Sequence, residues 1–209
     1  MSLENQTLNK FLDDLASGLP APGGGSVAAL GASLAAALVS MVSNLTVGKE
    51  KYRENREKMV EILAESERLR TKSLALISDD IKAFNAYMAA LKMPKETEEQ
   101  KSARKTELEK AAKQAAEVPM STLELCVEAS RLAALAAEYG NPNAATDAGS
   151  AAVFAEAAGK SAAYNVRINL PGISDEAFTA RAKEKMYCAL NEIAKNCKLA
   201  EAAMEKILK

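Results

Sequence analysis

Residues 20–26, with the sequence PAPGGGS, are the part of the chain best suited to contact a ligand through the backbone. Three successive glycines permit positive φ angles and the close approach of another molecule. The serine that follows can cap a helix whose first N–H groups face the loop and hold an anion or a polar ligand. The alternative is a tight turn between two packed helices. The substrate-binding residues expected here are Pro22, Gly23, Gly24, Gly25 and Ser26.

Asp80 is a carboxylate on an apolar helical face. It lies in the arc of Ile77 and Phe84, whereas Asp79 points away. Such a group must be paired, hydrogen-bonded or shifted to a raised pKa, and groups in that condition are enriched at functional sites, although a buried structural hydrogen bond is an equal alternative. The chain has no histidine, so proton transfer must use Asp, Glu, Lys, Tyr or water. Asp80 and Asp147 are the two carboxylates that helical geometry places on inward faces.

Narrow polar stripes mark two helices that consist largely of small residues. On a helix from 26 to 48, four residues fall within about 40° of one another at 100° per residue: Ser26, Ser33, Ser40 and Asn44. On a helix from 144 to 170, a wider stripe of about 100° contains Asn143, Asp147, Ser150, Ser161, Asn165 and Asn169. Close helix packing explains the serines better than it explains the Asn and Asp side chains.

The remaining pattern predicts helices almost everywhere and no strand. A short amphipathic helix around 8–15 ends at Gly18, and a long helix from 49 to 93 ends at Pro94. A capping box at residues 97–100 starts a helix that Pro119 breaks, and a second box at 121–124 starts another that ends at Gly140. The last helix runs from 174 nearly to the end. We therefore expect one all-α domain over residues 1–209, a bundle of long antiparallel helices with two small-residue-rich inner helices.

Composition excludes several classes of function. The 209 residues are 48% hydrophobic and 26% charged, which suits one soluble domain, and a net charge of −1 with 4% aromatic residues disfavours nucleic acid as a partner. Residues 27–47 are uncharged and long enough to cross a bilayer, but they are mainly Ala and Ser with no basic segment before them, so a buried helix is expected and no membrane partner. Three cysteines without metal-ligand spacing indicate reduced core thiols in a cytoplasmic protein, without disulfide or zinc.

Several ordered motifs together resemble the formiminotetrahydrofolate cyclodeaminase/methenyltetrahydrofolate cyclohydrolase family. They span the whole chain: the PAPGGGS loop, the region of Asn44, Lys49 and Tyr52, Asp80 with Phe84, the sequence PKET at 94–97, NAATD at 143–147 and NVRINL at 165–170. Thr146 stands where the family pattern has serine, a mild departure that leaves Asp147 intact. Nothing in the chain resembles the separate formiminotransferase domain of bifunctional relatives.

The resemblance implies an all-helical, homodimeric enzyme that acts on one-carbon units carried by tetrahydrofolate. In the cyclodeaminase reaction, N10 attacks the formimidoyl carbon on N5, ammonia leaves and the 5,10-methenyl bridge remains, which requires orientation, an acid and a base. We expect Asp80 and Asp147 to be catalytic and no metal or cofactor to be needed. The amide groups that would bind the pterin are those of Asn44, Asn143, Asn165 and Asn169. The cations that would bind the glutamate tail are Lys49 and Arg167.

Two alternatives stay open. Methenyltetrahydrofolate cyclohydrolase, in which water opens the same bridge to 10-formyltetrahydrofolate, would use the same pocket. The second alternative is a protein that is not an enzyme: a helical oligomer in which the stripes of small residues only pack helices together.

Overall fold

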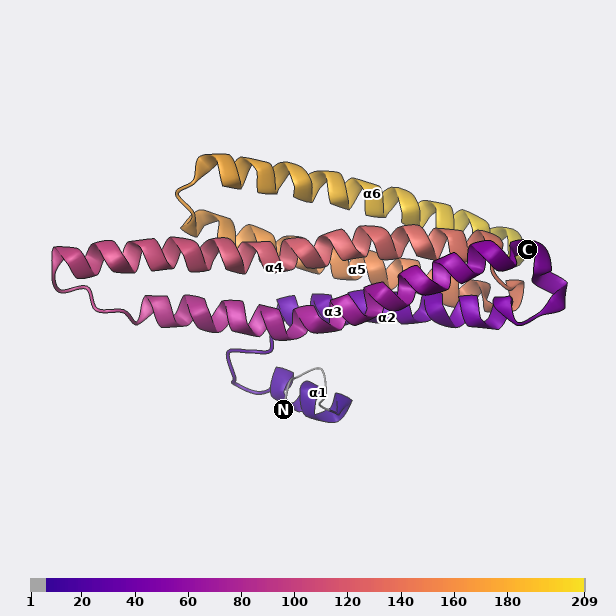
Figure 1. The fold of residues 1–209 in the computed structure, drawn as a ribbon, viewed down its shortest axis with the longest axis horizontal. Coiled ribbons are helices and arrows are strands. Elements are labelled where there is room, and N and C mark those ends of the chain that lie inside the picture. The colour runs from indigo at the N-terminus through magenta and orange to yellow at the C-terminus, as the bar shows by residue number, and fades with distance from the viewer. Residues whose placement is uncertain (1–6, 209) are drawn as a thin grey trace.

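The computed structural model describes residues 7–208, and within that range it contains helices and no strand (Figure 1). Three 3₁₀ segments separate some of the α-helices: η2 (Glu50–Asn55), η3 (Pro142–Ala144) and η4 (Leu170–Gly172). The α-helices are α1 (Leu8–Ala16), α2 (Gly24–Val47), α3 (Arg56–Leu91), α4 (Glu98–Tyr139), α5 (Ala145–Asn169) and α6 (Glu176–Leu208). The predicted all-α fold is confirmed.

The long helices lie side by side along one axis, with α3 and α6 on opposite sides of the bundle (Figure 1). Helix α2 packs against α3, α4 and α5, and α6 packs against α4 and α5. Two clusters of buried side chains fill the interior, one around Leu69 and Leu132 and the other around Val166 and Met186. The short helix α1 lies outside the bundle and is attached through Phe11, which packs against Ala29 and Ile77.

Helices α2 and α5 are antiparallel neighbours whose small residues let their backbones come close. A Cβ added at Gly31 of α2 would lie 3.1 Å from the Cβ of Ala158 on α5. The Ser161 hydroxyl near the end of α5 donates to the Gly24 carbonyl at the start of α2. Helix α2 is long and apolar enough to span a membrane, but most of its residues are buried inside the bundle, as in the core helix of a globular protein.

Pro119 does not break α4, contrary to the sequence expectation, and the predicted second capping box at 121–124 is wrong. The helix runs through the buried proline without interruption. Proline has no N–H to offer the carbonyl four residues earlier, which is that of Ala115. The side-chain amide of Asn169 donates to this carbonyl at 2.9 Å, so a residue of α5 replaces the missing helical hydrogen bond.

Two further expectations need adjustment. The long helix predicted from 49 to 93 begins as the 3₁₀ segment η2, in which Tyr52 has non-helical angles, and is α-helical only from Arg56. The three cysteines are free, as expected, but they are not all core thiols, because Cys188 is exposed and Cys197 is half-buried. Burial raises the pKa of the Cys126 thiol to about 12, so that thiol is unreactive.

Candidate active site

The Asp80 carboxyl lies against the first turn of α2. The Ser26 hydroxyl donates to Asp80 Oδ2 at 2.8 Å, and the Ser26 backbone N–H donates to the same carboxyl. The sequence suggested that Ser26 caps α2, but the structure shows that it does not. Gly23 occupies the cap position, and Ser26 is the third helical residue, buried and directed at α3. The predicted loop and the anomalous carboxylate thus form one site.

The glycines serve close approach and not unusual backbone angles. No glycine among residues 7–208 has a positive φ, so that part of the sequence argument is wrong. A Cβ on Gly25 would lie 2.1 Å from Asp80 Oδ1, and a Cβ on Gly24 would lie 3.2 Å from Asn165 Nδ2. Side chains at these positions would occupy the space of the carboxyl and of the amide. Pro22 is buried and Gly24 is exposed, so the loop forms an edge of the site that solvent reaches.

Burial raises the pKa of the Asp80 carboxyl, and the two hydrogen bonds from Ser26 oppose that shift by stabilising the charged form. The burial effect is the larger of the two. The positive end of the α2 dipole is also close to the carboxyl, which favours the ionised form. Burial thus favours the protonated form of Asp80, which can donate a proton, whereas the hydrogen bonds from Ser26 favour the anion, which can accept one.

The end of α5 forms the opposite side of the site. Asn165 is half-buried next to Gly24, and its amide donates to the Ser161 carbonyl at 2.9 Å, which leaves its Oδ1 available. Asn169 is more constrained, because its amide donates to the carbonyls of both Ala115 and Asn165. Asn165 can therefore contact a ligand, whereas Asn169 holds α4 and α5 together. Ser161, which the sequence analysis placed in a stripe but not in the site, borders it through Gly24.

Four other predicted site residues lie near the end of α2 and the start of α5, away from Asp80: Asn44, Lys49, Asn143 and Asp147. Asn44 is 18 residues after Ser26, and Asp147 is 18 residues before Asn165, so each is about 27 Å away along its helix. Within one chain the structure does not bring Asp147 to Asp80. Asp147 is half-buried, while the other three members of this group are exposed: Asn44, Lys49 and Asn143.

A buried asparagine that the sequence analysis missed organises this far end. The Asn141 backbone N–H donates to the Thr46 hydroxyl at 2.9 Å, and its side-chain Oδ1 accepts from the Tyr52 hydroxyl at 2.8 Å. The turn of sequence NPN gave only the signal of a loop. Asn141 fixes the start of α5 against the end of α2 and so places Asn143 and Asp147.

Arg167 is exposed and points away from the carboxyl. It lines a separate pocket with Leu170, Lys183 and Tyr187, between the end of α5 and the start of α6. No cluster of three potential metal ligands occurs among the described residues 7–208.

Comparisons with known proteins decide the family. Residues 7–187 match the model of the formiminotransferase-cyclodeaminase family. A methenyltetrahydrofolate cyclohydrolase from Methylorubrum extorquens is 42% identical over 204 residues, which are 97% of this chain and 98% of that protein. The chain belongs to the formiminotransferase-cyclodeaminase family.

Other members of the family agree with this assignment. The crystal structure of formiminotetrahydrofolate cyclodeaminase from Thermotoga maritima superimposes with a TM-score of 0.89 at 32% identity and covers 99% of both chains. The formimidoyltransferase-cyclodeaminase of Sus scrofa is 33% identical over 91% of this chain, which spans only 35% of that longer protein. The whole-chain resemblance noted from the motifs is confirmed, and the helical fold is the one found in the solved cyclodeaminase.

Proposed function

We propose that this member of the formiminotransferase-cyclodeaminase family acts on the one-carbon bridge between N5 and N10 of tetrahydrofolate. The observation that carries the proposal is the half-buried Asp80 carboxyl, bonded to Ser26 at a helix N-terminus and facing Asn165 across the glycine loop. The names of the relatives supply the substrate class. A partly buried carboxyl in this position can give and take the proton that chemistry at this bridge requires.

In the cyclodeaminase reaction the substrate is 5-formimidoyltetrahydrofolate. N10 attacks the formimidoyl carbon and its proton passes to the imino nitrogen, which becomes an amino group. The C–N bond to this amino group then breaks, and the products are ammonia and the cationic 5,10-methenyl bridge. The amine leaves after it gains a proton, which the Asp80 carboxyl can donate because burial favours its protonated form. The resulting carboxylate stabilises the positive charge of the bridge. The Asn165 Oδ1 can accept a hydrogen bond from the pterin.

The cyclohydrolase reaction is the second candidate, and the relative with 42% identity over almost the full length of both chains favours it. Water attacks the methenyl carbon and Asp80 accepts one of its protons. The remaining hydroxyl proton moves to N5 as the bond from carbon to N5 breaks, which gives 10-formyltetrahydrofolate. The solved cyclodeaminase, at 32% identity, favours the first reaction. Both reactions would use the same carboxyl.

Two parallel assays separate these candidates. The purified protein is mixed with 5-formimidoyl-tetrahydrofolate in one and with 5,10-methenyltetrahydrofolate in the other, and the absorbance of the methenyl group is followed. Appearance of the absorbance identifies the cyclodeaminase, and its accelerated disappearance identifies the cyclohydrolase. If the protein neither reacts with nor binds a reduced folate, the proposal is wrong and the non-catalytic helical oligomer becomes the better reading.

We propose also that the enzyme is a homodimer formed through α2 and α5. Both helices expose large apolar side chains on adjoining faces, and contiguous patches of this kind mark association surfaces. Tyr164 and Ile168 are 66% and 75% exposed, the two largest exposed fractions among the large hydrophobic residues of the described chain. The whole face comprises Val27, Leu34, Met41 and Leu45 of α2 with Val153, Phe154, Tyr164 and Ile168 of α5.

A two-fold axis across the middle of this face would complete the site. The pairs Ser26–Asn44 and Asn165–Asp147 are both 18 residues apart. If two copies pair with their α2 and α5 helices reversed, the far end of one copy lies opposite the Asp80 end of the other, because a two-fold interface is self-complementary. Asp147, Asn143, Asn44 and Lys49 would then approach the site of the partner subunit. This arrangement unites the residues that one chain keeps about 27 Å apart.

The remaining functional assignments follow from this reaction. Proton transfer and charge stabilisation by carboxylates require no metal or other cofactor, so we propose that the folate is the only small molecule bound. We propose that the enzyme acts in the cytoplasm, without nucleic acid or membrane as partner. Its apolar helix α2 is largely covered by other helices, and the exposed remainder belongs to the proposed dimer face.

A further inference from the structure

Ser26 and Ser33 project within about 20° of each other on α2, and both reach across to α3. The Ser33 hydroxyl donates to the Arg70 carbonyl at 3.2 Å, so this bond joins two neutral groups and fastens one helix to the other. The Ser26 hydroxyl donates to Asp80 Oδ2 at 2.8 Å, and this partner can gain or lose a proton. The same side chain in the same stripe therefore has a different effect at Ser26, where it acts on a titratable group.

Ser26 and its partner differ in their exposure. Ser26 is 0% exposed and lies on the side of α2 that faces α3. Asp80 is only half-buried, so solvent reaches this residue. A substrate can therefore contact Asp80, whereas Ser26 influences a reaction through the carboxyl to which it is bonded.

Among residues 7–208, no charged side chain contributes to the pKa of Asp80. Burial raises that pKa, and the two hydrogen bonds from Ser26 lower it. Helix α2 contains no charged residue, and Asp13 of α1 and Arg167 of α5 are exposed. The other charged side chains nearby on α1, α3 and α5 form pairs: Lys10 with Asp14, Asp79 with Lys82, and Glu156 with Lys160. Ser26 is thus the side chain that stabilises the anion of Asp80.

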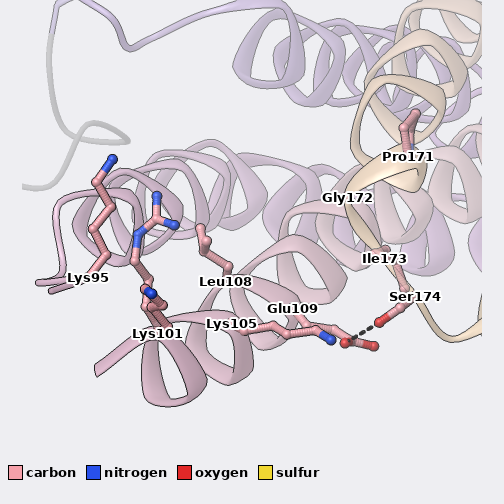
Figure 2. Close-up of a pocket in the computed structure, with 10 residues that line it drawn as sticks. Lys95, Lys101, Lys105, Leu108, Glu109, Pro171, Gly172, Ile173 and Ser174 are labelled. Atoms are coloured by element: carbon pink, nitrogen blue, oxygen red, sulfur yellow. Dashed lines mark hydrogen bonds between the residues drawn. The ribbon is translucent and has the colours of Figure 1, made fainter. Parts of the chain in front are cut away.

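The cations of a basic pocket near the end of α3 are remote from Asp80. This pocket of about 530 Å³ lies between the connection from α3 to α4 and the segment η4 (Figure 2). Its charged lining consists of Lys95, Lys101, Arg104, Lys105 and Glu109. Arg104 donates to the Leu91 carbonyl at 3.2 Å, and Leu91 follows Asp80 by about 16 Å along the helix. Physiological salt screens exposed charges beyond about 8 Å, so the basic pocket does not set the protonation of Asp80.

We propose that Ser26 is a positioning residue for Asp80: its hydroxyl holds Oδ2, so that Oδ1 exchanges the proton with the folate. This inference rests on the proposed function, which makes Asp80 the acid or the base. It replaces the substrate-binding role expected for Ser26 from the sequence. While Ser26 donates to Oδ2, the proton of the neutral carboxyl is carried by Oδ1. A Cβ on Gly25 would lie 2.1 Å from Oδ1, so glycine at this position leaves the room that this orientation requires.

The first test is the kinetics of Ser26→Ala with the folate that the wild type turns over. Alanine removes the hydroxyl, and its high helix propensity preserves α2. The anion of Asp80 loses a hydrogen bond, so the limb of the pH profile of kcat that belongs to Asp80 should move to higher pH. Loss of orientation should lower kcat by about ten- to a hundredfold. KM should stay within about twofold, because Ser26 does not contact the substrate.

The second test measures the carboxyl directly and needs no turnover. Aspartate labelled with carbon-13 is titrated by nuclear magnetic resonance, and the Asp80 signal is identified by its absence from Asp80→Asn. Its midpoint should move to higher pH in Ser26→Ala. The matched control is Ser33→Ala, which removes a buried hydroxyl from the same face of α2 but one bonded to a neutral carbonyl. This control should keep the midpoint of Asp80, and its kcat should stay within about twofold of the wild type.

Each outcome supports or contradicts the role of Ser26. An unchanged midpoint of Asp80 in Ser26→Ala would overturn the inference. An equal loss of kcat in Ser33→Ala would also overturn it, because it would show a general effect of loosening α2 from α3. A higher KM with unchanged kcat in Ser26→Ala would return Ser26 to substrate binding. If the wild type turns over neither folate while the midpoint moves in Ser26→Ala, the proposed function is contradicted and the positioning of Asp80 by Ser26 is supported.

Discussion

Asp80 is the residue on which the proposed chemistry depends. Asp80→Asn keeps the shape of the side chain but can neither carry a proton nor hold a negative charge, so turnover should fall by about 10² to 10⁴-fold while the fold remains. The matched control is Asp79→Asn, because Asp79 is 46% exposed and paired with Lys82 on the outside of the same helix. Steady-state kinetics and circular dichroism of both variants check this prediction. Near-normal turnover of Asp80→Asn would assign Asp80 a structural role.

The raised pKa of Asp80 also predicts how stability changes with pH. Between the ordinary value of 3.8 and the raised value, the folded protein binds this proton more tightly than the unfolded chain does. The stability contributed by the group is therefore present at low pH and is lost as the pH rises through the raised pKa. Asparagine does not titrate, so Asp80→Asn should melt at a higher temperature than the wild type at pH 7, and the difference should shrink below pH 4.

Thermal melting of both proteins across this pH range checks the sign of the effect. A variant that is less stable than the wild type at pH 7 would mean that the hydrogen bonds from Ser26 outweigh burial.

Gly25 is the glycine that the geometry makes least replaceable. In Gly25→Ala the new Cβ would lie 2.1 Å from Asp80 Oδ1, so the carboxyl must move away from Ser26. We expect turnover to fall more than tenfold, since a misplaced catalytic group loses orientation. Gly18→Ala, whose Cβ would meet no atom within 4 Å, is the control.

Gly24→Val should weaken folate binding more than folding, because its Cβ would press on Asn165 Nδ2 at 3.2 Å. Folate affinity and melting temperature of the variants distinguish this from a role as a simple turn. A large loss of stability with unchanged affinity would show that the triplet serves only the turn.

At the scale of elements, the hydrogen bond from Asn169 to the Ala115 carbonyl explains how α4 tolerates Pro119. Removing the amide in Asn169→Ala leaves that carbonyl without a partner, which should lower the free energy of unfolding by about 1 to 3 kcal/mol. In a Pro119→Ala background the helical N–H is restored, so the same change should cost less. Denaturant unfolding of the single and double variants measures this coupling. Strict additivity would show that the two residues act independently.

At the scale of the whole molecule, the proposed dimer predicts complementation between two inactive variants. If each site combines Asp80 of one copy with Asp147 of the other, a hybrid of Asp80→Asn and Asp147→Asn subunits contains one site with both aspartates intact. Refolding equal amounts of the two variants together should recover about a quarter of the wild-type activity, because half of the dimers are hybrids with one intact site in two. Activity that stays at the level of the separate variants would contradict the shared site.

The apolar face of α2 and α5 provides an independent test of the same assembly. Ile168→Glu places a charge on a side chain that is 75% exposed in the single chain, so the monomer should fold normally while the dimer dissociates. Val60→Glu, on an exposed position of α3 outside this face, is the control. Sedimentation of both variants checks the prediction, and an unchanged dimer in Ile168→Glu would place the interface elsewhere.

The sequence by itself determined the class of fold, the length of most helices and the position of Asp80 on an apolar helical face. These features depend on local properties: the 3.6-residue period, the stop signals at Gly18 and Pro94, and a carboxylate on an apolar arc. The motifs also determined the family, which the comparisons confirmed. Local rules were wrong about Pro119, where a side chain from another helix satisfies the freed carbonyl, and about Ser26, which bonds to α3 and does not cap its own helix.

Only the tertiary structure decided which of the candidate residues meet. Helical angles give the direction of a side chain but not its neighbours, so the sequence could not tell that Ser26, Asp80 and Asn165 converge while Asp147 lies about 27 Å away along α5. The basic pocket was also beyond sequence reasoning, because its lining combines the connection after α3, the start of α4 and η4. Contacts between segments far apart in the chain depend on how whole helices pack, and no local pattern records that packing.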